Sequence, residues 1–217
     1  QMGVSKESAD NMSQWSARFQ MYNDDLRWGR INEQYKRPVT LIYPEELRFK
    51  EWYDTYKRNT YKLSLGYTQI LNKRNTIGFF PEVTYQQGLL ATPFHRIYFN
   101  NDSLAVEQLP NERLKTSVNL KLNSFISGNL ILKNSLNAYA DDFGILGLAI
   151  ANETAIKIRP QFTLLPNARW YLQKGSKYFA PYKTHAPTET YFTSDYDLSD
   201  FTTYNMGIGF KYSPFKY

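Results

Sequence analysis

Strand-like alternation recurs along this chain, and the connections between the strand-like segments alternate between long and short. We predict about eight antiparallel strands of roughly ten to fourteen residues each. They cover residues 13–22, 60–71, 76–87, 114–126, 129–139, 146–159, 162–173 and 204–212. Short turns at one rim and long loops at the other are typical of a β-barrel that spans an outer membrane. An even number of strands would also place both chain ends on the turn side.

The same pattern divides the chain into two parts. Residues 1–12 are predicted to be an N-terminal segment, and residues 13–217 a barrel with short periplasmic turns and long extracellular loops. The expected fold is therefore an all-β, antiparallel transmembrane β-barrel, located in the bacterial outer membrane. The chain starts at Gln1 rather than Met, which either a processed N-terminus or a lost upstream segment would explain.

Composition removes several classes of function. The best apolar run, residues 145–151, is far shorter than the roughly 20 residues that a membrane-spanning helix needs. Cysteine is absent, so disulfides and thiolate metal sites are excluded. The net charge of +6 is spread along the chain without a basic cluster among stacking aromatics, so no nucleic-acid partner is expected. No segment indicates a cofactor.

The last strand shows the alternation most clearly. One face carries Tyr204, Met206, Ile208, Phe210 and Tyr212, and the other carries small or polar residues. A final strand of this kind, ending in aromatic residues, resembles the signal by which outer-membrane barrels are recognised for insertion. We therefore expect Phe210 and Tyr212 to form that signal.

Alternation alone fits a soluble lipocalin-like barrel as well, with the two faces exchanged. Side-chain size favours the membrane barrel, because the polar face is rich in Gly, Ala, Ser and Asn, which suit a crowded interior. Aromatic residues lie near the ends of the apolar face, as in the aromatic girdles of membrane barrels. They are Trp15, Tyr61, Tyr85, Trp170, Tyr204 and Tyr212. The expected surroundings are outer-membrane lipid and lipopolysaccharide.

Two features fit regular strands badly. Pro81 and Pro166 lie within predicted strands, where each removes a donor from the ladder, so we expect a β-bulge at each. Asn134 and Asn152 lie on the apolar face of neighbouring strands and should be opposite each other if the hairpin is centred near Phe143. They are either a cross-strand amide pair that satisfies itself or a face covered by a partner protein.

The polar face is predicted to hold an excess of cations. A lumen network is expected from Arg18, Glu82, Lys121, Lys133, Glu153 and Arg169. In a barrel of about eight strands the side chains would fill the interior, and each glutamate would have to serve several cations. In a wider barrel the same residues would line an anion-favouring channel.

The long loops contain the least common sequence patterns. One holds Thr92, Pro93, Phe94, His95 and Arg96. His95 could serve a barrel hydrolase or acyltransferase, although it lacks a spacing signature for catalysis. In the last long loop, Asp195, Asp197 and Asp200 could supply hard oxygen ligands to Ca²⁺, but their spacing is not that of an EF-hand. Capping of turns by Asp is the simpler interpretation.

These loop patterns carry a resemblance. Residues 43–48, 65–74, 88–96, 178–182 and 191–199 resemble a Bacteroidota family of predicted outer-membrane proteins that is catalogued as a domain of unknown function. The resemblance runs from about residue 12 to the end of the chain. It implies a barrel fold and an outer-membrane location, and no functional residue follows from it.

We therefore expect a non-enzymatic outer-membrane barrel that acts as an accessory or binding subunit of a cell-envelope protein complex. Its protein partners would lie in the outer membrane or at the cell surface. One alternative is a pore for small anionic solutes, if further strands or subunits widen the barrel. Another is a barrel enzyme that uses His95.

Overall fold

In a computed structural model of the chain, residues 1–25, 57–92 and 96–214 are described. They form an antiparallel β-sheet, which confirms the predicted all-β class, and none of their helices is long and apolar enough to cross a membrane. The strands are β1 (Met2–Glu7), β2 (Ser13–Asp25), β3 (Lys57–Asn72), β4 (Asn75–Gly88), β5 (Arg96–Tyr98), β6 (Leu104–Val106), β7 (Glu112–Ser127), β8 (Leu130–Asp141), β9 (Leu146–Arg159), β10 (Phe162–Lys174) and β11 (Phe201–Tyr212). A 3₁₀ helix, η2, spans Tyr196–Leu198.

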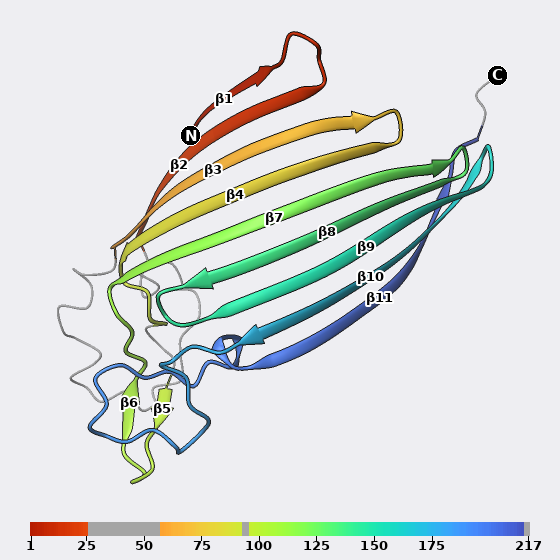
Figure 1. The fold of residues 1–217 in the computed structure, drawn as a ribbon. Helices are drawn as coiled ribbons and strands as arrows, with labels where there is room; N and C mark the ends of the chain where they lie inside the picture. The colour runs from red at the N-terminus through yellow and green to blue at the C-terminus, as the bar shows by residue number, and fades with distance from the viewer. Residues whose placement is uncertain (26–56, 93–95, 215–217) are drawn as a thin grey trace.

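Nine of these strands form one curved sheet in the order β1-β2-β3-β4-β7-β8-β9-β10-β11 (Figure 1). Strands that follow one another in the chain pair with each other, except that β4 pairs with β7 because β5 and β6 lie outside this sheet. Strands β5 and β6 pair only with each other. The sheet is open within the described residues, since β1 pairs with β2 alone and β11 with β10 alone. The described residues thus show a sheet rather than a closed barrel.

The strand β1 corrects the predicted N-terminal segment. Met2 and Val4 share one face of this strand with Lys6, while Gly3, Ser5 and Glu7 share the other, and residues Met2–Glu7 pair antiparallel with β2 from Met2↔Phe19 to Glu7↔Gln14. The prediction missed this strand because six residues give little periodic signal. With nine strands in place of eight, the chain starts beside the middle of β2, at Met2↔Phe19, and not at the turn end, where β11 finishes (Figure 1).

The predicted alternation of connections is confirmed. Residues 8–12, 73–74, 128–129 and 160–161 connect strands at one end of the sheet, the turn end. Residues 89–111 and 175–200 connect strands at the other, the loop end (Figure 1). The β3–β4 turn closes through Asn72, whose side-chain Oδ1 accepts hydrogen bonds from the backbone N of Arg74 at 2.8 Å and of Asn75 at 3.0 Å. Asn is favoured in tight turns because its side chain bonds the backbone in this way.

The two prolines interrupt the ladder without the expected bulges. Between β3 and β4 the pairs Ser64↔Glu82 and Tyr67↔Phe79 flank Pro81 in the same register. Between β9 and β10 the register is likewise unchanged on either side of Pro166. Each proline lacks one donor, but it stays in register with the strand on its other side, as in Pro81↔Val118 and Pro166↔Ile208. The loss of one hydrogen bond is therefore absorbed without an inserted residue.

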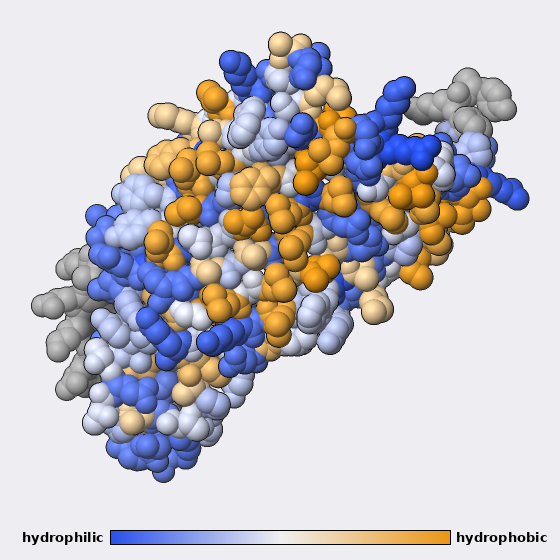
Figure 2. Space-filling model, viewed as in Figure 1, coloured by the Kyte–Doolittle hydropathy of each residue, from blue (hydrophilic) through white to orange (hydrophobic). Residues whose placement is uncertain are grey.

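The ladder registers divide the sheet into the two predicted faces. Trp15 lies opposite Tyr67, Ala17 opposite Leu65, and Trp170 opposite Tyr204, all on one face, which we call the outward face. Its large apolar side chains are exposed along the whole sheet, up to 81% for Met206. In Figure 2 apolar side chains lie over the strands, and mostly hydrophilic ones cover the loop end. Nearly all of the buried apolar residues lie instead in the connections at the loop end.

Candidate functional site

The face opposite the outward face, which we call the inner face, carries the charges predicted for a lumen. Lys62 Nζ lies 2.8 Å from Glu82 Oε1, and Ser64 donates a hydrogen bond of 3.0 Å to the other carboxylate oxygen of Glu82. Lys133 Nζ lies 2.7 Å from Glu153 Oε1. Each glutamate therefore pairs with one lysine on the adjacent strand, instead of serving several cations as predicted.

The other predicted cations of this face contact aromatic rings or line a hollow. Lys121 Nζ lies 5.1 Å from the centre of the Phe80 ring, and the Arg169 guanidinium lies 5.7 Å from that of Tyr171. Arg18 lines an inner-face hollow of about 790 Å³ and forms no ion pair with a described residue. The six predicted residues thus share a face without forming one network.

The prediction missed a buried charge cluster where the inner face meets the loop end. Arg113 Nε donates to Asp141 Oδ2 at 3.0 Å, and the Tyr139 hydroxyl donates to the same oxygen at 2.8 Å. The Asp141 side chain is fully buried, and the Arg113 guanidinium lies 4.5 Å from the centre of the Phe143 ring. The sequence does contain a signal for this cluster, because the alternation continues past the predicted strand ends. Arg113 lies two residues before Lys115 and Asp141 two residues after Tyr139, so each shares the face of that neighbour.

The long connections fold together into one compact body, which we call the loop unit (residues 96–110, 143–145 and 176–200). Its core holds Ile97, Phe99 and Phe192, with the rings of Phe99 and Phe192 centred 5.0 Å apart. Gln108 and Phe192 exchange backbone hydrogen bonds of 3.2 and 2.8 Å, which joins the two longest of these segments. The loop end is therefore a folded structure with its own hydrophobic core.

A chain of hydrogen-bonded polar groups, buried except for Glu189, crosses the loop unit. His185 is 1% exposed, its Nδ1 lies 2.6 Å from Glu189 Oε2, and its Nε2 lies 2.8 Å from the backbone O of Thr193. Thr193 in turn donates its hydroxyl to the buried carboxylate of Glu107. Burial acts to raise the pKa of Glu189, but the backbone N–H of Ala186 and the His185 ring outweigh it and lower that pKa.

The contacts of His185 are structural rather than catalytic. Both ring nitrogens face an oxygen that accepts from an N–H, so both hydrogen bonds are made fully when the ring carries two protons. Neither nitrogen is left to take a proton from a nucleophile. His185 lies in the last long connection, and the fold buries it beside Phe192, whose ring centre is 5.9 Å away.

The predicted loop motifs are only partly described. Pro93, Phe94 and His95 lie outside the described residues, so the catalytic interpretation of His95 stays a prediction. The backbone N of Thr92 donates to the Glu107 carboxylate, and Arg96 begins β5.

The three aspartates of the last loop serve turns. Asp195 caps η2 by accepting a 3.0 Å hydrogen bond from the backbone N of Asp197, whose carbonyl O accepts one of 2.9 Å from Gln173. Asp200 Oδ1 accepts one of 2.9 Å from the backbone N of Gly175. No group of three metal-ligating side chains occurs in the described part of the chain. Turn capping therefore describes Asp195 and Asp200, and the structure gives the calcium interpretation no support.

The predicted asparagine pair is confirmed on the outward face. Asn134 lies opposite Asn152 in the β8–β9 ladder, and Asn152 Nδ2 donates to Asn134 Oδ1 at 2.8 Å. Thr154 adds a hydroxyl that donates to Asn152 Oδ1 at 2.8 Å. The pair thus satisfies much of its own hydrogen bonding. Phe210 and Tyr212, predicted as an insertion signal, also lie on the outward face, at the edge strand β11, and both are largely exposed.

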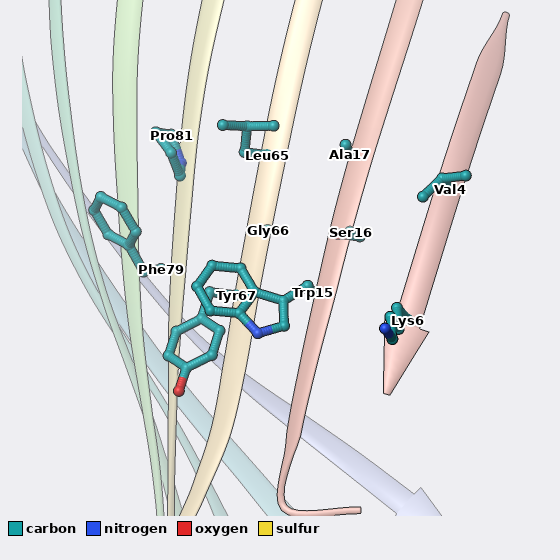
Figure 3. Close-up of a pocket in the computed structure, with 10 residues that line it drawn as sticks. All are labelled: Val4, Lys6, Trp15, Ser16, Ala17, Leu65, Gly66, Tyr67, Phe79 and Pro81. Atoms are coloured by element: carbon teal, nitrogen blue, oxygen red, sulfur yellow. The ribbon is translucent and has the colours of Figure 1, made fainter. Parts of the chain in front are cut away.

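The outward face carries an apolar hollow over β1–β4, shown in Figure 3, with a volume of about 260 Å³. Trp15 and Tyr67 form one wall, with ring centres 4.2 Å apart. Lys6 lies at the end of the hollow nearest the turns (Figure 3). The sequence pattern gave no sign of this hollow, because it arises from side chains on four different strands.

Comparison with known proteins adds a family and no activity. No curated protein and no solved structure matches the chain. The model of one family, described as a protein of unknown function (DUF3570), matches residues 5–216, which includes part of β1 as well as the predicted barrel region. The chain therefore belongs to the DUF3570 family of proteins of unknown function.

Proposed function

We propose that this chain forms most of the wall of an outer-membrane β-barrel, with the loop unit at the cell surface. Its role is that of a non-enzymatic accessory or binding subunit in a cell-envelope complex. The observation that carries the proposal is the outward face, which stays apolar and exposed from β1 to β11.

The extent of that face argues against a soluble protein. Soluble monomers rarely expose an apolar patch larger than a few hundred Å². Here the exposed apolar side chains include Val4 on β1, Leu65 on β3, Leu120 on β7, Ile150 on β9 and Ile208 on β11. Hydrocarbon tails would cover such a surface, and the aromatic residues near its margins match the girdles of membrane barrels.

The two open edges argue for closure through further strands. Unpaired backbone groups are costly in lipid, so a membrane sheet must close into a barrel. In this nine-stranded meander β1 and β11 run in the same direction, so pairing them directly would give a parallel contact (Figure 1). A second copy in the same membrane orientation would give parallel contacts as well. Antiparallel closure thus needs an odd number of strands outside this sheet.

The need for at least one further strand supports a pore as the second candidate function. Nine strands and at least one more give a barrel wider than the eight-stranded kind, whose interior side chains just fill. On the inner face Lys62 and Lys133 are paired with glutamates, while Lys121, Arg169 and Arg18 form no ion pair with a described residue. Well-resolved, anion-favouring steps in planar-bilayer recordings would favour the pore over the accessory role.

Heat-modifiable mobility tests the barrel. The protein should partition into detergent and migrate differently on gels before and after boiling, because closed antiparallel ladders resist cold detergent. Purification as a detergent-free soluble monomer would contradict the proposal.

Cysteine labelling tests the orientation. The chain has no native cysteine, so single replacements report cleanly. Lys183 in the loop unit should react with an impermeant reagent on intact cells, and Lys73 in the β3–β4 turn should not. The reverse pattern would invert the orientation.

Crosslinking tests the accessory role. Photoreactive residues at 134 and 152 should capture a protein if a partner covers the asparagine pair, whereas one at Val83 on the same face should not. Lipid adducts at all three positions would leave the asparagines as a self-satisfied pair and restrict partner binding to the loop unit.

A further inference from the structure

The hollow on the outward face lies between ladder rows of different character. Nearest the turn end, Lys6, Trp15, Tyr67 and Phe79 form a row across β1–β4, which we call the interfacial row. The next row toward the loop end, the aliphatic row, contains Val4, Ala17, Leu65 and Pro81 (Figure 3). The row beyond it contains Met2, Phe19, Leu63 and Val83.

Side-chain size explains the hollow. Ala17 and Pro81 project little from the sheet, while Trp15 stands on one side of the aliphatic row and Phe19 on the other. The backbone of Gly66 also lines the hollow, although a side chain at this position would point to the inner face, against Ser16 and Phe80. The side chains that point into the hollow are aliphatic or aromatic apart from Lys6.

Polarity changes across these rows in one direction. Beyond the interfacial row, closer to the turns, Ser13 lies opposite Gln69, and Ile77 of β4 lies on the other side of Gln69. The Tyr67 hydroxyl donates to Gln69 Oε1 at 2.9 Å, which points the polar end of that ring toward the turn end. From the turns inward, β2 and β3 therefore present polar groups and then aromatic rings beside the Lys6 cation, followed by aliphatic side chains. A phospholipid presents the same order from its headgroup to its acyl chains.

We propose that this hollow binds one anionic glycerophospholipid of the leaflet at the turn end. One acyl chain lies over Ala17 and Pro81, and the phosphate contacts the Lys6 ammonium. The inference rests on the proposed membrane function, which puts the turns on the periplasmic side. Lys6 is exposed and forms no ion pair with a described residue, so its charge is available to a headgroup.

Lysine on an edge strand has a simpler role, which is to prevent pairing with other chains. The two roles differ in one measurable respect. A lysine that only protects an edge gives no preference among lipids, whereas a cation that holds a phosphate headgroup favours anionic lipid. One lysine near an anionic membrane surface favours binding about fivefold.

Trp15 reports the occupant directly, because brominated acyl chains quench tryptophan on contact. Replacing Trp28, Trp52 and Trp170 by Phe leaves Trp15 as the sole tryptophan, which can be excited selectively over tyrosine. In vesicles, brominated phosphatidylglycerol should compete for the hollow about fivefold better than brominated phosphatidylcholine. Lys6→Gln should reduce that ratio to about one. A matched variant that retains only Trp170, on the outward face of β10, should show no preference.

Filling the hollow provides an independent arm. Ala17→Phe should displace the acyl chain and weaken the quenching of Trp15, while Ala138→Phe, at a small outward position of β8, should leave it unchanged. Equal quenching by both lipids, or a preference that survives Lys6→Gln, would overturn the lipid site while leaving the membrane wall intact. Absence of quenching at both Trp15 and Trp170 by either lipid would overturn the proposed function itself.

Discussion

Replacing Phe192 by Ala should open the loop unit and leave the sheet folded. Phe192 is 5% exposed, packs against Phe99 and His185, and holds the two backbone hydrogen bonds to Gln108. Removing a buried Phe side chain costs about 3–5 kcal/mol. The sheet should be unaffected, because its apolar side chains face outward and are not packed on this core.

That cost converts into a large change in local opening. At about 1.4 kcal/mol per factor of ten, the open population of the loop unit should rise at least a hundredfold. Cleavage of a transiently opened segment follows that population when opening and closing are fast. Trypsin should therefore cut after Lys177 and Lys183 at least a hundred times faster in Phe192→Ala than in the unmodified protein.

Tyr196→Ala is the matched control. Tyr196 also packs against an aromatic ring, that of Phe179 at 5.4 Å, but it is 62% exposed. An exposed aromatic pair contributes about 0.5–1.5 kcal/mol, so cleavage should rise by about tenfold or less. Equal cleavage rates in the two variants would refute the core assigned to the loop unit. Loss of heat-modifiable mobility in Phe192→Ala would refute its independence from the sheet.

Three further predictions concern polar groups. Because the pKa of Glu189 is lowered in the folded protein, its carboxylate stabilises the loop unit above pH 4.5, the ordinary pKa of a glutamate. That stabilisation is lost as the pH falls through the lowered pKa of the folded state. In that pH range hydrogen exchange of residues 176–200, corrected for its intrinsic pH dependence, should accelerate, and the acceleration should be less steep in Glu189→Gln. In urea titrations from vesicles, Asp141→Asn should lower the free energy of unfolding by about 3–5 kcal/mol, because Arg113 loses its buried charged partner. Glu82→Gln removes a partly exposed ion pair with Lys62, so it should cost about 1 kcal/mol or less. A double-mutant cycle with Asn134→Leu and Asn152→Leu should give a coupling of about 0.6 kcal/mol; a value near zero would show that the amides do not interact in the membrane.

The sheet was predictable where its sequence alternates over many residues. The position of Asn134 opposite Asn152 follows from counting outward from Phe143, because a two-residue period fixes which residues share a face. The short strand β1 was not predictable in this way. Six residues carry little periodic signal, and Met2–Glu7 is recognisable mainly through its ladder with β2.

The sites were less predictable than the strands, since they depend on contacts between distant segments. The hydroxyl of Thr193 reaches Glu107 across 86 positions of sequence, and no local pattern indicates that contact. The burial of His185 has the same origin, because Phe192 and the Thr193 carbonyl cover it only once the long connections have folded together. The expected bulges at Pro81 and Pro166 were wrong because a missing donor on one side does not require an extra residue when the other side stays in register.

The polar contacts of the loop unit support the proposed binding role. Its buried ionisable groups, Glu107 and His185, are engaged with partners inside the unit, and the exposed Glu189 bonds to His185, so these groups help to hold the loops in shape. What the unit presents to solvent includes the rings of Tyr182, Tyr191 and Tyr196. Tyrosine is enriched in protein interfaces, because it offers a large rigid contact area with a polar end. A unit that shows tyrosines to solvent and holds Glu107 and His185 in internal hydrogen bonds supports the proposed role as a binding subunit.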